Sequence, residues 1–194
     1  MCIRDRMNAR ELVKLAARAD KPILRLRSSH DKPKREKTLR AEALDSDEFN
    51  NLSAMLCMCE GARVLLQRNE WVEAGLMNGA IGMVRGFVWP EGGDPNARKA
   101  DGSADLTKQA LCVVVEFDDV NLGEEEARNE DGTVQRDADG KAVMVPRTFF
   151  PGLDLGLDAQ GKPRANKCVP IFRGEATSDQ DETLKRHQFP LTLA

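Results

Sequence analysis

Closely spaced turn residues divide the middle of this chain into short apolar segments, which leaves little room for long helices. Residues 62–67 and 80–89 are apolar and rich in Val, Leu and Ile, residue types that favour strands. Gly61 precedes the first segment, and Asn78-Gly79, a pair that accepts positive φ at little cost, precedes the second. The pattern predicts short strands joined by turns.

Two further local patterns add detail to this prediction. Gly82 and Gly86 fall within the second strand, where glycine is typical of a bulge or of a close approach by another backbone. Residues 8–19 have apolar positions at helical spacing, with Asn8 as the expected N-cap and Glu11 three residues later. We therefore expect one short helix that begins after Asn8.

The remaining periodic segments complete a mainly β pattern. A helical turn or irregular connector is expected at residues 45–53, and a small hairpin around residues 137–140. Pro170 favours the edge of a sheet. Five or six short strands and one helix predict the α+β class, with a small β-barrel as its main part. The other strands are expected at residues 23–27, 55–58, 109–117, 168–173 and 188–193.

Several stretches have no periodic pattern. Residues 28–40 are expected to form a basic loop, and residues 175–186 a polar linker. Residues 91–105 and 121–165 are rich in Gly, Asp and Glu, which predicts flexible insertions.

Charge is unevenly distributed, although the net charge of the chain is only -3. Residues 1–40 contain 13 Lys/Arg and 5 Asp/Glu, whereas residues 91–160 contain 7 and 16. A basic end beside an acidic insertion is typical of a protein that binds polyanions on one side. The alternative is an ordinary solvated surface with an acidic loop, which has the same distribution of charged residues. No segment approaches the ~20 apolar residues that span a bilayer, and no secretory signal follows Met1. We expect an intracellular chain with no membrane partner, in the nucleus, the mitochondrion or the bacterial cytoplasm.

Residues 61–86, GARVLLQRNEWVEAGLMNGAIGMVRG, resemble a segment found late in superfamily-one DNA helicases of the Pif type and the related RecD type. In that family a Gly-Ala-Arg-Val-Met-Leu strand leads to an Asn, then to Gly-Leu-Val-Asn-Gly and a Gly-x-Val strand. Leu65 stands where the family has Met, which conserves volume. The other matching positions are Gly61, Ala62, Arg63, Val64, Leu66, Asn69, Gly75, Leu76, Asn78, Gly79, Gly82 and Val84. Similarity in the same order extends over residues 8–27, 50–90, 110–120 and 168–194, roughly half the chain.

The resemblance implies a RecA-like α/β motor domain interrupted by an SH3-like β-barrel, called domain 2B. Residues 50–185 would be the barrel with its flexible insertions, and residues 7–49 a part of the second RecA-like domain with a connector. Residues 186–194 would be a truncated return strand to that domain. Residues 1–6, MCIRDR, fit nothing downstream and resemble a translated sequencing adapter. We therefore expect a fragment of an ATP-dependent DNA helicase that translocates on and unwinds DNA, in a family that acts in DNA repair and recombination.

The motifs for ATP hydrolysis are missing from this sequence. It has no G-x-x-x-x-G-K-[ST] loop, and Asp118-Asp119 has no such loop to act with. The arginine finger that completes hydrolysis in such motors would follow residue 194. The resemblance therefore implies ATP and Mg²⁺ for the parent protein and no cofactor in this chain. Its implied partners are single-stranded DNA and the remaining motor domains.

Candidate DNA contacts gather in the segment that carries the resemblance. Arg63 points outward from its strand, either to a phosphate or to Glu60 or Glu116. Trp71 either stacks on a base or packs its loop onto the barrel. No catalytic residue or metal ligand is predicted. The predicted nucleic-acid-binding residues are Arg63, Arg68, Asn69, Trp71, Asn78 and Arg85.

Two alternatives remain at this level. Cys57, Cys59, Cys112 and Cys168 form either a four-thiolate zinc site or a set of buried apolar residues, and the C-x-C spacing of the first two favours burial. For the whole chain, the alternative to a helicase fragment is a free-standing SH3-like module that binds nucleic acid or a peptide without catalysis.

Overall fold

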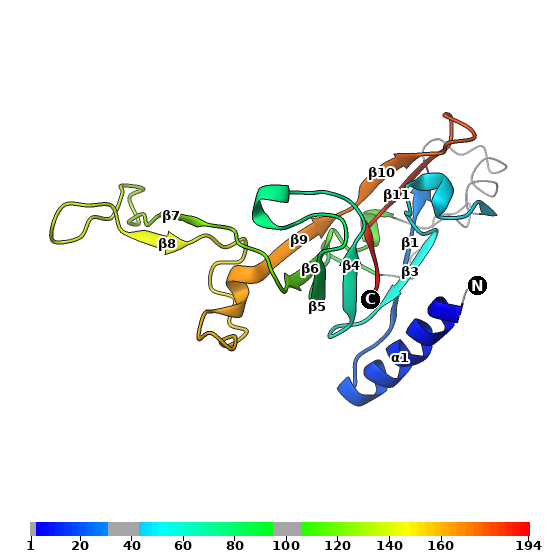
Figure 1. Ribbon diagram of the computed structural model, residues 1–194, viewed down its shortest axis with the longest axis horizontal. Helices are drawn as coiled ribbons and strands as arrows, with labels where there is room; N and C mark the ends of the chain where they lie inside the picture. The colour runs from blue at the N-terminus through cyan, green and yellow to red at the C-terminus, as the bar shows by residue number, and fades with distance from the viewer. Residues whose placement is uncertain (1–2, 31–42, 95–105) are drawn as a thin grey trace.

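The computed structural model describes residues 3–30, 43–94 and 106–194, and a five-stranded antiparallel sheet forms its centre (Figure 1). The strand order is β12-β4-β5-β6-β9, so β12 and β9 are its two edges. The position of Pro170 in edge strand β9 confirms the prediction for that residue. The strands are β4 (Arg63–Leu66), β5 (Ile81–Val88), β6 (Cys112–Phe117), β9 (Cys168–Phe172) and β12 (Leu191–Leu193).

The two glycines of β5 have the roles predicted for them. A Cβ atom on Gly82 would lie 2.6 Å from Val115 Cγ1 and 2.7 Å from the Glu116 carbonyl oxygen, so β6 can approach only because no side chain is present. Register with β6 shifts between Val84 and Gly86, which is the predicted bulge.

Two smaller sheets flank the central one. Strands β1 (Leu24–Arg27) and β3 (Met55–Met58) form an antiparallel pair. A second sheet has the order β10-β11-β2, with β10 at Gly174–Thr177, β11 at Lys185–Gln188 and β2 at Ser29–His30. The chain is therefore mainly β, as predicted, but the sheets of the described residues do not close into a barrel.

The polar linker predicted at residues 175–186 is wrong, because most of β10 and half of β11 lie there. Their inward positions are held by Ala176 and by Arg186, whose side chain is fully buried. The Arg186 guanidinium lies 4.0 Å from the centre of the Phe49 ring and donates to the Leu52 carbonyl oxygen at 2.7 Å. A strand that buries a charged side chain has no apolar alternation, so the sequence pattern does not show it.

The helix α1 (Ile3–Ala19) begins earlier than predicted. The N-cap prediction for Asn8 is wrong, because residues 3–7 contain neither Pro nor Gly and continue the helix toward the N-terminus. Asn8 instead lies inside α1, and its Nδ2 donates to the Leu193 carbonyl oxygen at 3.1 Å. Leu12 and Ala16 pack into the main core. None of the helices in the described ranges is long and apolar enough to cross a lipid bilayer.

Two hydrophobic clusters stabilise the fold. The larger one lies between α1, the β1–β3 pair and the central sheet, where β4, β5 and β6 contribute Val64, Val84 and Val115. The smaller one joins Phe49 and Leu52 to Ala176 and Leu184 of the β10–β11 hairpin. Short 3₁₀ helices connect the strands: η1 (Asp47–Phe49), inside the helical turn predicted at 45–53, η2 (Val72–Ala74), η3 (Leu106–Lys108) and η4 (Arg164–Lys167).

An arm built on β7 (Glu124–Glu126) and β8 (Met144–Pro146) projects from the body of the molecule (Figure 1). The hairpin predicted around residues 137–140 is confirmed, because Asp137 N donates to the Lys141 carbonyl oxygen at 2.9 Å. The predicted insertion at 121–165 therefore contains regular structure, closed by short polar turns. Residues 95–105 of the other predicted insertion, and residues 31–40 of the basic loop, lie outside the described residues.

Candidate nucleic-acid interface

A closed loop at residues 69–78 connects β4 to β5 and contains three of the predicted site residues. Asn69 Oδ1 accepts a hydrogen bond from Asn78 N at 2.9 Å, which joins the two ends of the loop. Glu70 N and Trp71 N both donate to the Leu76 carbonyl oxygen, at 2.9 and 3.1 Å. The amide oxygen of Asn69 is therefore already engaged within the protein.

Glycines allow this loop to turn and to lie against the sheet. Gly75 has φ +87°, and a Cβ atom there would lie 2.8 Å from the Asp119 carbonyl oxygen. Gly79 has φ +93°, and its N–H donates to the Leu66 carbonyl oxygen at 2.8 Å. The predicted turn is confirmed, but Gly79 takes the positive φ and Asn78 does not.

Trp71 supports the loop from inside. Its half-buried side chain packs against the main hydrophobic core, and its backbone forms a β-bridge with Leu76. The structure therefore favours the packing role over base stacking for this residue.

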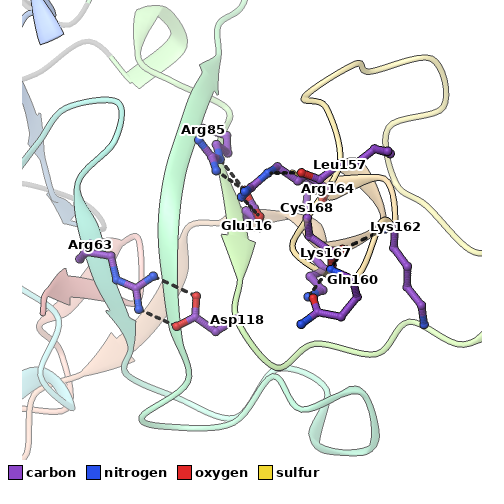
Figure 2. Close-up of polar contacts among 11 residues, drawn as sticks. Arg63, Arg85, Glu116, Asp118, Leu157, Gln160, Lys162, Arg164, Lys167 and Cys168 are labelled. Atoms are coloured by element: carbon purple, nitrogen blue, oxygen red, sulfur yellow. Dashed lines mark hydrogen bonds and ion pairs between the residues drawn. The ribbon is translucent and has the colours of Figure 1, made fainter.

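Arg63 forms a bidentate ion pair on the outer face of the central sheet. Its Nη1 and Nη2 lie 2.9 and 2.5 Å from Oδ1 and Oδ2 of Asp118 (Figure 2). The hydrogen bonds from Arg63 lower the pKa of Asp118 below its ordinary value. Glu60, one of the two expected partners, pairs with Lys21 at 2.7 Å instead.

Arg85 shares its partner with a residue that the sequence did not point to. Its Nε donates to Glu116 Oε2 at 2.5 Å, and Arg164 Nη1 donates to Glu116 Oε1 at 3.0 Å (Figure 2). The Glu116 side chain is only 10% exposed, so two guanidiniums neutralise one nearly buried carboxylate. Arg164 belongs to a stretch without periodicity, and no sequence signal identifies it.

Arg68 leaves the end of β4 in another direction. Its Nε is hydrogen-bonded to Glu70 Oε1, and its guanidinium occupies the space where Gly174 would carry a Cβ atom. The predicted arginines therefore lie in two places: Arg63 and Arg85 on the outer face of the sheet, and Arg68 at the junction with β10.

The four described cysteines do not gather at one place. Cys112 and Cys168 lie on neighbouring strands but pair with Phe172 and Glu116, toward opposite ends of the ladder. No group of three or more His, Cys, Asp or Glu side chains suited to a metal ion occurs among the described residues. Burial raises the pKa of Cys168 to about 11, so its thiol stays protonated at neutral pH.

Comparison with known proteins gives partial similarity to solved helicase structures. No family model and no curated protein matches this chain. A Pif1 helicase from Candida albicans is similar at 19% identity and a TM-score of 0.48, over 98% of this chain and 32% of that one. A double mutant of the Pif1 helicase from Bacteroides is similar at 14% identity and a TM-score of 0.45, over 98% of this chain and 27% of that one. A structure of two coordinating Pif1 helicases at forked double-stranded DNA has 14% identity and a TM-score of 0.42, over 98% and 25%. This chain thus spans between a quarter and a third of the length of these proteins.

Proposed function

We propose that this chain is part of an ATP-dependent DNA helicase of the Pif or RecD type, and that it contacts and guides single-stranded DNA. In this proposal the open sheets correspond to an SH3-like module inserted in a RecA-like motor domain. ATP and Mg²⁺ serve the parent protein, whose other motor parts bind them. This chain supplies no residue for ATP hydrolysis, and its contribution is to the path of the strand.

The observation that carries the proposal is the structure of the segment with the helicase resemblance. Its Asn, Gly and Asn-Gly positions are the residues that close the 69–78 loop, through the Asn69–Asn78 hydrogen bond and the two positive φ angles of Gly75 and Gly79. The residues that match the family therefore form one structural unit, which follows Arg68 and the strand that begins at Arg63. Loops at strand ends are where binding residues concentrate.

To bind a phosphate, Arg63 and Arg68 would exchange their carboxylate partners for it. Arg63 and Arg68 are 43% and 40% exposed in their side chains, so solvent and DNA can reach both guanidiniums. Exposed ion pairs contribute about 0–1 kcal/mol, so a phosphate can replace Asp118 or Glu70 at small expense. We expect weak binding, at or beyond the weak end of the ~10⁻⁴–10⁻⁶ M range of non-specific complexes.

The test is the salt dependence of binding to fluorescently labelled oligothymidine, measured by anisotropy. Each phosphate contact on a single strand contributes about 0.7 to the slope of log K against log salt. Arg63→Ala combined with Arg68→Ala should flatten this slope by up to about 1.4. Lys141→Ala combined with Lys162→Ala removes the same charge from two exposed lysines, one in the β7–β8 arm and one between β8 and β9, and should leave the slope unchanged.

Circular dichroism of each variant checks that its fold is intact. No measurable binding by the wild-type chain would defeat the proposed function. Equal slopes for the wild-type chain and the Arg63/Arg68 variant would remove these two arginines from the DNA path.

A further inference from the structure

Two arginines on β1 differ from those that the sequence singled out. Each of the three predicted arginines is paired with a carboxylate. Arg25 and Arg27, by contrast, make no side-chain hydrogen bond or ion pair with any residue in the described ranges. Their charges are available to an anion without the loss of an existing partner.

The strand geometry places these two charges side by side. Arg25 and Arg27 are two residues apart, so both lie on one face of β1 and about 7 Å apart along the strand. Leu26 between them points into the core and is fully buried. Their cross-strand neighbours on β3 are Cys57 and Met55, which carry no charge. The outer face of the β1–β3 pair therefore has two cations and no carboxylate opposite them.

Two side chains from other parts of the fold bond the backbone of β1. Arg173 Nη1 donates to the Arg27 carbonyl oxygen at 2.9 Å, and Gln188 Nε2 donates to the Leu26 carbonyl oxygen at 2.9 Å. Gln188 Nε2 also lies 3.4 Å from the Ser53 carbonyl oxygen, so these side chains tie the backbone of β1 to neighbouring segments of the fold. Arg25 and Arg27 are thus carried by a fixed strand.

The same junction connects Arg68 to β1 through Gly174 and Arg173. Its guanidinium lies against Gly174, the residue that follows Arg173, and Arg173 in turn bonds the backbone of Arg27. Arg173 and Gly174 therefore lie between Arg27 and Arg68, and the guanidinium of Arg173 adds a third positive charge there. Glu70 is the carboxylate that pairs with Arg68.

Arg173 adds positive potential at this junction. Its hydrogen-bond acceptors are the neutral oxygen of Gln109 at 2.8 Å, that of Gln188 at 3.3 Å and the backbone carbonyl of β1, and no carboxylate pairs with it among the described residues. Burial lowers the pKa of Arg173 to about 10, which leaves it cationic at neutral pH. The local charge therefore favours an anion.

We propose that Arg25 and Arg27 bind backbone phosphates of a single-stranded nucleic acid whose path continues to Arg68. This inference rests on the proposed function and extends the contact beyond the residues that the sequence indicated. The acidic β7–β8 arm lies at the opposite end of the molecule from α1 (Figure 1), so it does not oppose an approach of DNA to β1.

The experiment uses the same oligothymidine titration with a charge-removing and a charge-keeping variant. Arg25→Gln combined with Arg27→Gln should flatten the salt slope by about 1.4, in addition to the effect of the Arg63/Arg68 variant. Arg25→Lys combined with Arg27→Lys keeps both charges and should keep the slope of the wild-type chain. Lys141→Gln combined with Lys162→Gln is the matched control and should also keep it.

The outcomes separate this inference from the proposed function. If the wild-type chain binds with a salt slope that Arg25→Gln/Arg27→Gln leaves unchanged, the proposed function stands and the β1 contact is wrong. If the Lys variant loses as much slope as the Gln variant, a structural effect replaces phosphate contact and the β1 proposal also fails. If the wild-type chain does not bind, the proposed function fails and this inference fails with it.

Discussion

At the scale of single residues, burial decides which ion pair matters to the fold. The Glu116 carboxylate is 10% exposed and accepts hydrogen bonds from Arg85 and Arg164. The Arg63–Asp118 pair has better bidentate geometry, but both side chains are more than 40% exposed. The nearly buried Glu116 carboxylate is poorly solvated, so loss of its ion pairs should change the free energy of unfolding more than loss of the exposed Arg63–Asp118 pair.

Glu116→Gln should therefore destabilise the chain by about 1–3 kcal/mol, because it leaves two guanidiniums without their shared counter-charge. Asp118→Asn, the exposed control, should change the free energy of unfolding by at most about 1 kcal/mol. Urea unfolding followed by circular dichroism measures both values. Equal effects of the two substitutions would show that burial does not distinguish the pairs.

At the scale of elements, the central hairpins could be predicted from the sequence and the outer ones could not. Strands β4, β5 and β6 are local apolar segments, and the glycines of β5 indicate its bulge and the close approach of β6. Strands β10 and β11 have no such pattern, because their inward positions include Arg186 and Gln188, whose burial depends on partners far along the chain.

The two glycines of β5 give a matched pair of substitutions within one strand. Gly82→Ala should destabilise the chain by about 1–3 kcal/mol, because the new methyl group would overlap Val115 and the Glu116 carbonyl oxygen. Gly86→Ala meets no atom within 4 Å and should change stability by less than about 1 kcal/mol. Thermal or urea unfolding measures the loss of stability in each of the two variants. A larger loss for Gly86→Ala would contradict the account of how β5 packs on β6.

The candidate site is predictable only in part, because some of its contacts depend on residues far along the chain. The residues of the 69–78 loop follow from a local pattern, and the loop forms as a unit. Ion-pair partners depend on which strands become neighbours: Arg63 meets Asp118 because β4, β5 and β6 are adjacent, and Asp118 directly follows β6. That Arg25 and Arg27 face uncharged Cys57 and Met55 on β3 is also a property of the assembled sheets, which composition alone does not reveal.

At the scale of the whole molecule, the charge asymmetry of the sequence becomes a separation in space. The basic residues of α1 and β1 lie at one end, and the exposed glutamates of β7 lie on the arm that projects from the other (Figure 1). Such a distribution orients a polyanion toward one face and away from the other. In the proposed complex the nucleic acid lies along β1 and the 69–78 loop, and the arm is free of it.

Hydrogen–deuterium exchange with and without saturating oligothymidine tests this central claim most directly. Backbone amides of residues 24–27 and 69–79 should exchange more slowly in the complex, and those of residues 124–146 should be unchanged. Protection confined to the arm, or an exchange pattern that DNA does not alter at concentrations where anisotropy reports binding, would contradict the account.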